Sequence, residues 1–94
     1  MVFLVITYII KNEFRNSFIE AANKYIDASR KETINLSFDY GQGKNENDFV
    51  FVSRWVSDKS YNEHKKTEHF KEFANSIIPM LGDNFIPNII KGIR

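Results

Sequence analysis

The chain has 94 residues, 43% of them hydrophobic, and 13 lysine and arginine residues against 12 aspartate and glutamate residues give a net charge of +1. A chain of this length forms one domain, residues 1–94, and needs nearly every apolar side chain for its core. The balanced charge excludes an electrostatic footprint for nucleic acid, an anionic membrane or a polyanionic substrate. The absence of cysteine excludes disulfides, thiolate nucleophiles and cysteine metal sites, and it is compatible with the cytoplasmic location that we expect.

An apolar strand and a helix are predicted first. The run Val2–Ile10 is too short for a membrane-spanning helix and lacks the basic start of a signal peptide, while its β-branched and aromatic residues favour a buried strand. Asn12 is a candidate N-cap for a helix that continues to about Arg30, with Glu13 at its positive end. The predicted buried face of this helix comprises Phe14, Phe18, Ala21, Ala22, Tyr25, Ile26 and Ser29.

A β-hairpin is predicted next. Alternation over residues 34–40 places Ile34, Leu36, Phe38 and Tyr40 on one face of a half-buried strand. A polar connection rich in glycine and asparagine, residues 41–47, leads to a second strand, Phe49–Val56.

Two helical segments and a last strand complete the chain. Ser57 and Asp58 begin a helical stretch through Lys65, and Thr67 caps a second helix. The apolar face of that second helix comprises Phe70, Phe73, Ala74, Ile77, Ile78 and Leu81, with Pro79 near its end. A turn at Gly82-Asp83-Asn84 precedes a strand over Phe85–Ile90, which belongs at a sheet edge because Pro87 cannot donate a ladder hydrogen bond.

The order of these elements predicts an α+β fold of ferredoxin-like βαββαβ topology. Its four-stranded antiparallel sheet has both helices on one face and the first and third strands at its centre. Those central strands, Val2–Ile10 and Phe49–Val52, are apolar on both faces, which indicates a homodimer that packs sheet against sheet. A shallow ligand pocket or tolerated surface hydrophobics are the alternatives.

Two histidines and one tryptophan are the candidate functional residues. His64 and His69 stand five residues apart, so their relative geometry cannot be read from helical spacing. They lack a third ligand at a recognisable interval, so we expect no metal. His64 is a candidate general base, because imidazole titrates near neutral pH, or else a structural residue. Trp55 serves either packing or a pocket wall.

Other motifs carry less chemistry. Glu63 and Glu68, each next to a histidine, are expected to be solvated carboxylates, because adjacent residues diverge on a helix. Gly41 and Gly43 stand between two strands and not before a helix, so they form neither a phosphate loop nor a dinucleotide fingerprint, and no cofactor is expected.

The segment Phe49–Trp55, followed by His64 and Thr67–Phe70, resembles the antibiotic biosynthesis monooxygenase family. That family has a strand ending in tryptophan, a histidine nine residues later and a second histidine five beyond it, as Trp55, His64 and His69 stand here. Further segments similar to the family's first helix and second-strand entry extend the resemblance to about Val2–Leu81; they are Lys11–Glu13, Phe18–Ala21 and Ser29–Phe38. The chain departs from the pattern at Ile34, where glycine is usual, Phe38, where tyrosine is usual, and Ser53, where an acidic residue is common.

The resemblance implies a homodimeric α+β barrel with one pocket per subunit between helices and sheet. It also implies oxidation of a small phenolic or quinol-type substrate by O₂ without flavin or metal. We expect His64 to act as the catalytic base, and the expected substrate contacts are Trp55, His69, Phe51 and Phe73. Ile6 and Ala74 occupy the positions where haem-degrading relatives carry asparagine and histidine, so haem cleavage is not expected.

Two other functions fit the same scaffold. One is a non-catalytic module that binds or senses a small molecule, because a fold does not fix a function. The other is an isomerase for a small carbonyl compound in which His64 moves a proton without oxygen. Oxygen uptake separates both alternatives from a monooxygenase.

Overall fold

The computed structural model describes residues 1–82 and 88–93 and contains one sheet covered by helices. In chain order the strands and helices are β1 (Val2–Ile9), α1 (Arg15–Arg30), β2 (Asn35–Gln42), β3 (Asp48–Trp55), α2 (Asp58–His64), α3 (Glu68–Ile77) and β4 (Asn88–Ile93). Two short 3₁₀ helices, η1 (Asn12–Phe14) and η2 (Ile78–Met80), adjoin α1 and α3.

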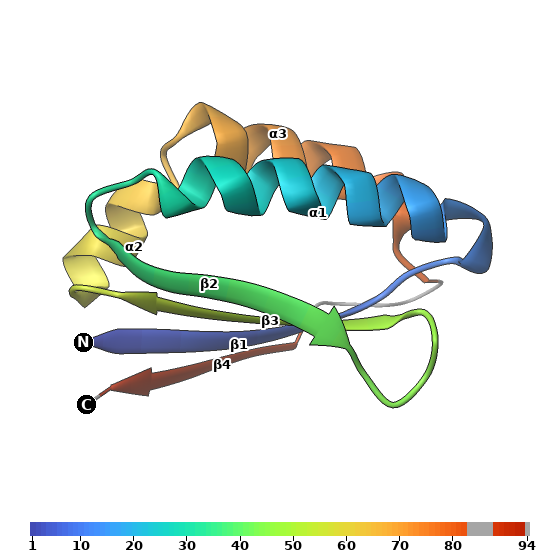
Figure 1. Ribbon diagram of the computed structural model, residues 1–94, viewed down its shortest axis with the longest axis horizontal. Coiled ribbons are helices and arrows are strands. Elements are labelled where there is room, and N and C mark those ends of the chain that lie inside the picture. Colours follow the sequence, from blue (N-terminus) through green and yellow to red (C-terminus); the bar gives the residue numbers. More distant parts are fainter. Residues whose placement is uncertain (83–87, 94) are drawn as a thin grey trace.

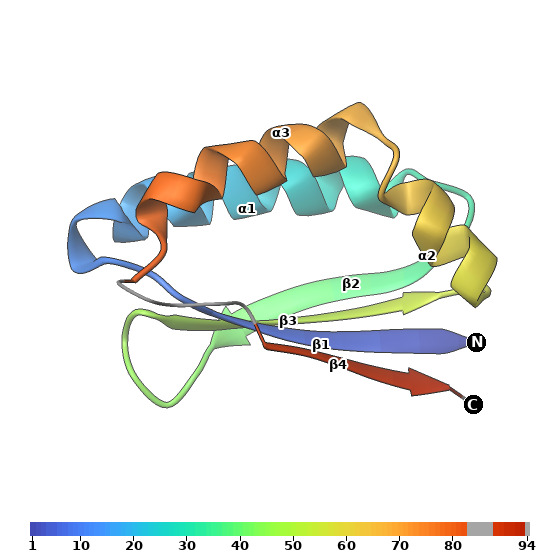
Figure 2. The same cartoon turned by 180° about the vertical axis from the view of Figure 1, so that it is seen from behind.

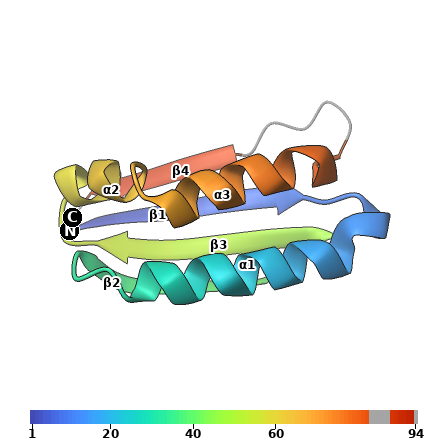
Figure 3. The ribbon, with the colours of Figure 1, turned by 90° about the horizontal axis from the view of Figure 1, so that it is seen from above.

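The four strands form an antiparallel sheet in the order β2-β3-β1-β4. Figures 1 and 2 show that α1, α2 and α3 lie on one side of this sheet, and Figure 3 shows α1 and α3 running side by side along it. The predicted α+β ferredoxin-like architecture is therefore confirmed, with β1 and β3 at the centre and β4 at an edge. Among the described residues, no helix is both long enough and apolar enough to cross a membrane.

The strand register determines which side chains meet the helices. β1 and β3 pair as Val2 with Trp55, Leu4 with Ser53 and Tyr8 with Phe49, and all of these side chains are buried. Helix α1 covers them with its predicted face, of which Phe18, Ala22, Tyr25, Ile26 and Ser29 are fully buried. Burying one large apolar side chain stabilises the fold by roughly 1.5–3 kcal/mol, so this layer holds the sheet and helices together.

Helix caps follow the sequence in two places and not in a third. The Ser57 side chain accepts a hydrogen bond from the Ser60 amide at the start of α2, and Thr67 accepts one from the Phe70 amide at the start of α3. The predicted capping role of Asn12 is wrong, because Asn12 lies inside η1 and its side-chain oxygen accepts from Asn47.

Two predicted buried side chains are exposed. Leu36 is 54% exposed because the register of β2 against β3 shifts between Asn35 and Ser37, which places the extra residue outside the alternation. Ile78 is 65% exposed because α3 ends at Ile77 and the chain tightens into η2, where Pro79 lies in the first turn.

The last strand differs in position from the predicted one. β4 runs over Asn88–Ile93 and so continues beyond the predicted end at Ile90. The predicted turn residues Asp83 and Asn84, and the first part of the predicted strand, 85–87, lie outside the described residues.

Candidate active site

A cavity of about 370 Å³ lies between the sheet and the helices. Its wall is mostly aromatic and aliphatic, and the described residues lining it include no lysine, arginine, aspartate or glutamate. The lining residues are Ile6, Tyr8, Tyr25, Phe38, Phe51, Ser53, Trp55, Tyr61, His64, Phe70, Phe73, Ala74, Ile77, Ile78, Leu81 and Ile89. Apolar clefts and cavities with a few polar groups are the usual sites for small ligands.

Three of the expected substrate contacts line this cavity. Trp55, at the end of β3, is fully buried, so it serves the core as well as the cavity wall. Phe51 on β3 and Phe73 on α3 lie with ring centroids 5.8 Å apart and an interplanar angle of 28°. The two rings pack against each other, and both line the cavity, so a ligand there would meet aromatic side chains from the sheet and from α3.

His64, the last residue of α2, has a partner on each ring nitrogen. Its ring is 1% exposed and lies 4.2 Å from the Trp55 ring, centroid to centroid. Nδ1 lies 2.6 Å from Glu32 Oε2, and Nε2 lies 2.7 Å from the Tyr25 hydroxyl. Because a carboxylate can only accept, Nδ1 carries the proton, and in the neutral ring Nε2 accepts the proton of Tyr25.

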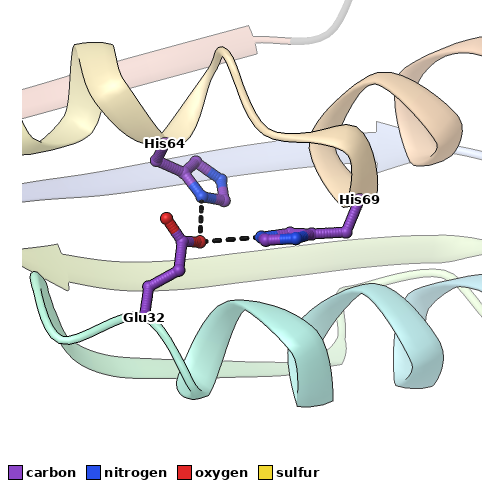
Figure 4. Close-up of side chains that lie close together, drawn as sticks. All are labelled: Glu32, His64 and His69. Carbon is purple, nitrogen blue, oxygen red and sulfur yellow. Dashed lines mark hydrogen bonds and ion pairs between the residues drawn. The ribbon is translucent and has the colours of Figure 1, made fainter.

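His69 meets the same carboxylate oxygen from the first turn of α3. Its Nε2 lies 2.8 Å from Glu32 Oε2, and Figure 4 shows the two imidazoles pointing at this oxygen from different directions. Thr67, whose hydroxyl donates to the His64 carbonyl, holds the short link between the two histidines. The sequence could not give this geometry, because both contacts depend on a residue in the turn after α1.

The structure separates His69 from the other expected substrate contacts. His69 is absent from the cavity lining and is 24% exposed on an open groove between α1 and α3. Its expected contact with substrate stays a prediction, whereas its observed contact is with Glu32. Glu63 and Glu68 are exposed, as the sequence predicts.

Burial sets the charge states of the polar groups in the cavity. Desolvation lowers the pKa of His64, and the Glu32 carboxylate opposes this effect only in part. Desolvation also raises the pKa values of Tyr8, Tyr25 and Tyr61 above the ordinary value for tyrosine. The site therefore holds neutral phenol side chains and a neutral imidazole at neutral pH.

Glu32, His64 and His69 also form a group with the composition of a metal site. Their candidate ligand atoms all lie within 4.8 Å of one another, so the third ligand that sequence spacing did not reveal is Glu32. Ligands at about 2.0–2.1 Å from a tetrahedral zinc ion are ~3.4 Å apart. The 2.6 Å and 2.8 Å separations from Glu32 Oε2 are instead those of hydrogen bonds, with the carboxylate oxygen between the two nitrogens.

Sequence reasoning missed the roles of Tyr25 and Glu32. Tyr25 was placed on the buried face of its helix, and a buried tyrosine hydroxyl needs a hydrogen-bond partner, which was the available signal. Glu32 lies within the segment that resembles the family's second-strand entry, but no role followed from its spacing. In the folded chain it occupies the turn between α1 and β2, and its side chain is 13% exposed.

Fold and site together define a small ferredoxin-like α+β domain with a cavity lined by aromatic side chains and a buried histidine. The comparison with protein families identifies that class further. Residues 1–76 match the family described as antibiotic biosynthesis monooxygenase, and the chain belongs to this family.

Known proteins agree with this assignment. The protein named "Putative monooxygenase YcnE" from Bacillus subtilis (strain 168) is 30% identical over 66 residues, which cover 69% of this chain and 70% of that protein. The crystal structure of an antibiotic biosynthesis monooxygenase matches with a TM-score of 0.92 and 19% identity, covering 100% of this chain and 98% of the other. Rv0793 from Mycobacterium tuberculosis matches with a TM-score of 0.91 and 15% identity, covering 99% and 93%. The two structural likenesses concern the fold.

Proposed function

We propose that this chain is a monooxygenase that oxidises a small, neutral phenolic or quinol-type molecule with O₂, using no flavin or metal. The observation that carries the proposal is the hydrogen-bonded chain from Tyr25 through His64 to Glu32 at the wall of an apolar cavity. Such a chain can take a proton from a substrate hydroxyl, which is the step that makes a phenol reactive toward oxygen.

The proton is removed by the Tyr25–His64 pair. The substrate hydroxyl donates to the Tyr25 oxygen as Tyr25 passes its own proton to His64 Nε2, 2.7 Å away. The resulting imidazolium donates its Nδ1 proton in a hydrogen bond to Glu32, and the negative charge of Glu32 stabilises the imidazolium. His69 donates to the same oxygen of Glu32 and so helps to hold the carboxylate in place.

The substrate supplies the electrons. The phenolate passes one electron to O₂, and the phenoxyl radical and superoxide combine to form a carbon–oxygen bond and a peroxide anion. The peroxide takes the proton back from the Tyr25–His64 pair. Its O–O bond then breaks, and hydroxide leaves with the ring C–H proton as water. The balance is phenol plus O₂ to quinone plus water.

The cavity favours a neutral, flat substrate. The described lining offers no fixed charge to balance a carboxylate or phosphate, so an acidic ligand would lose its hydration without compensation. The aromatic side chains in the lining, Phe51 and Phe73 among them, favour a planar aromatic molecule.

We further propose that two copies associate through the uncovered sheet face. Val5 on β1 lies between Val52 on β3 and Ile90 on β4, and the register places these three side chains on the face opposite the helices. Ile90 is exposed in the single subunit, and Ile9 lies further along the same face. Contiguous apolar surface of this kind is usually covered by a partner.

Oxygen consumption over a panel of quinols and naphthols tests the function. We expect substrate-dependent uptake by the wild-type protein, a quinone as product, and loss of uptake in His64→Ala and in the more conservative His64→Gln. Activity equal to wild type in both variants would remove His64 from its role. Substrate proton exchange without oxygen use would support the isomerase, and binding with neither would support the binding module.

A further inference from the structure

Ser53 carries a hydroxyl on the cavity wall, two residues before the end of β3. Ser53 is 4% exposed, and the sheet fixes its backbone between Leu4 of β1 and Phe38 of β2. Among the residues lining the cavity, Ser53 is therefore a polar group on a rigid element, and not on a loop.

The Ser53 hydroxyl has its oxygen engaged and its proton free. Trp55 Nε1 donates to Ser53 Oγ at 3.0 Å. An indole N–H is a donor only, so Trp55 cannot take the Ser53 proton in return. Within residues 1–82 and 88–93, the Ser53 hydroxyl donates no hydrogen bond. Because a buried donor without an acceptor is costly, a ligand in the cavity is the natural partner.

We propose that Ser53 donates a hydrogen bond to an oxygen atom of the ligand, so that the cavity selects planar apolar molecules carrying an acceptor oxygen, such as a quinone carbonyl or a phenol oxygen. The proposal rests on the proposed function in taking this cavity as the substrate site. The hydrogen bond from Trp55 polarises the hydroxyl and makes it a stronger donor.

A matched pair of ligands tests the inference by equilibrium dialysis of the full chain. The probes are 1,4-naphthoquinone, which has acceptor oxygens, and naphthalene, which has the same ring shape and none. We expect Ser53→Ala to weaken quinone binding about five- to tenfold, the loss typical of one hydrogen bond, and to leave naphthalene binding within about twofold. Ser53→Thr, which keeps a hydroxyl, should retain most of the quinone affinity.

Ser60→Ala serves as the control for deleting a buried hydroxyl away from the cavity, because Ser60 is 8% exposed, its hydroxyl pairs with Ser57 Oγ at 3.0 Å, and it should leave the binding of both probes unchanged. An equal loss for both probes, or no loss for either, would overturn the role of Ser53. Dialysis consumes no oxygen, so it tests Ser53 separately from the proposed reaction. If Ser53→Ala weakened quinone binding and not naphthalene binding while the wild type showed no oxygen uptake, the monooxygenase proposal would be wrong and the role of Ser53 would stand.

Discussion

The Tyr25 hydroxyl and His64 Nε2 lie 2.7 Å apart although the two residues are 39 positions apart in the chain. The contact joins α1 to the end of α2 and occupies the ring nitrogen that a substrate would otherwise reach. His64 therefore does not act on a substrate directly in this arrangement. The base is a pair, in which Tyr25 meets the substrate and His64 receives the proton.

Replacing the Glu32 carboxylate should make the Tyr25–His64 pair a weaker base but leave the pair in place. Glu32→Gln keeps the size of the side chain but removes the negative charge that stabilises imidazolium, so we expect kcat to fall about 10²-fold with little change in KM. The carboxylate raises the pKa of His64 against the effect of burial, so the acidic limb of the pH–rate profile should move to lower pH. Steady-state oxygen uptake between about pH 5 and pH 8 measures both effects.

Glu63→Gln is the matched control for that substitution. Glu63 is exposed and pairs with Lys66, at 3.4 Å, so its loss should leave the rate and the profile unchanged. An unshifted acidic limb in Glu32→Gln would contradict the proposed electrostatic role of Glu32, whatever the change in rate.

Acid should destabilise the fold through His64. Desolvation lowers the pKa of His64 in the folded state below its ordinary value of about 6.5, so the unfolded chain takes up this proton first as pH falls. Because the unfolded state then binds more protons, the free energy of unfolding decreases on acidification from about pH 7. Urea denaturation at several pH values should show a steeper decrease in the wild type than in His64→Gln, and equal slopes would refute the assignment.

The association of two copies should depend on the outer face of the sheet. Val52→Lys places a charge beside Val5, opposite the helices, and should shift the protein from dimer to monomer in sedimentation experiments. Asn16→Lys, on the exposed side of α1, should leave the dimer intact. A folded wild-type monomer at micromolar concentration would rule out the interface.

The glutamate and the two histidines should work without a metal ion. Their 2.6 Å and 2.8 Å contacts are hydrogen bonds, and binding zinc would require Glu32 to move out from between the two rings. We expect dialysis against a chelator to leave the melting temperature and the oxygen uptake unchanged. Loss of either property, with recovery on adding Zn²⁺, would assign a metal to this site.

Local patterns were sufficient to predict most of the fold. The apolar run of β1 and the three- and four-residue spacing along α1 identified the core, because burial follows periodicity when an element is regular. The predicted burial of Leu36 was wrong because a bulge inserts one residue and breaks the alternation. The predicted burial of Ile78 was wrong because a 3₁₀ turn replaces the end of the helix.

The site was harder to predict than the fold. Trp55 and His64 were candidates from their residue types, and the family resemblance implied their roles; both line the cavity. Two hydrogen bonds define the chemistry, and their partners are separated by 32 positions (Glu32 and His64) and by 39 positions (Tyr25 and His64). These contacts arise from the packing of α1 and its following turn against α2. No local pattern in one sequence encodes contacts of that range, which explains why Tyr25 and Glu32 were not assigned.

The ionisation of a bound phenol, measured without oxygen, tests the central claim most directly. The absorption spectrum of a naphthol added to the anaerobic protein near pH 7 should show the naphtholate band with the wild type. It should show only the neutral naphthol with His64→Gln, and a strongly reduced naphtholate band with Tyr25→Phe, which removes one hydroxyl but keeps the ring stacked 4.3 Å from Phe73. A neutral spectrum with the wild type, or a naphtholate band that persists in both variants, would contradict the account.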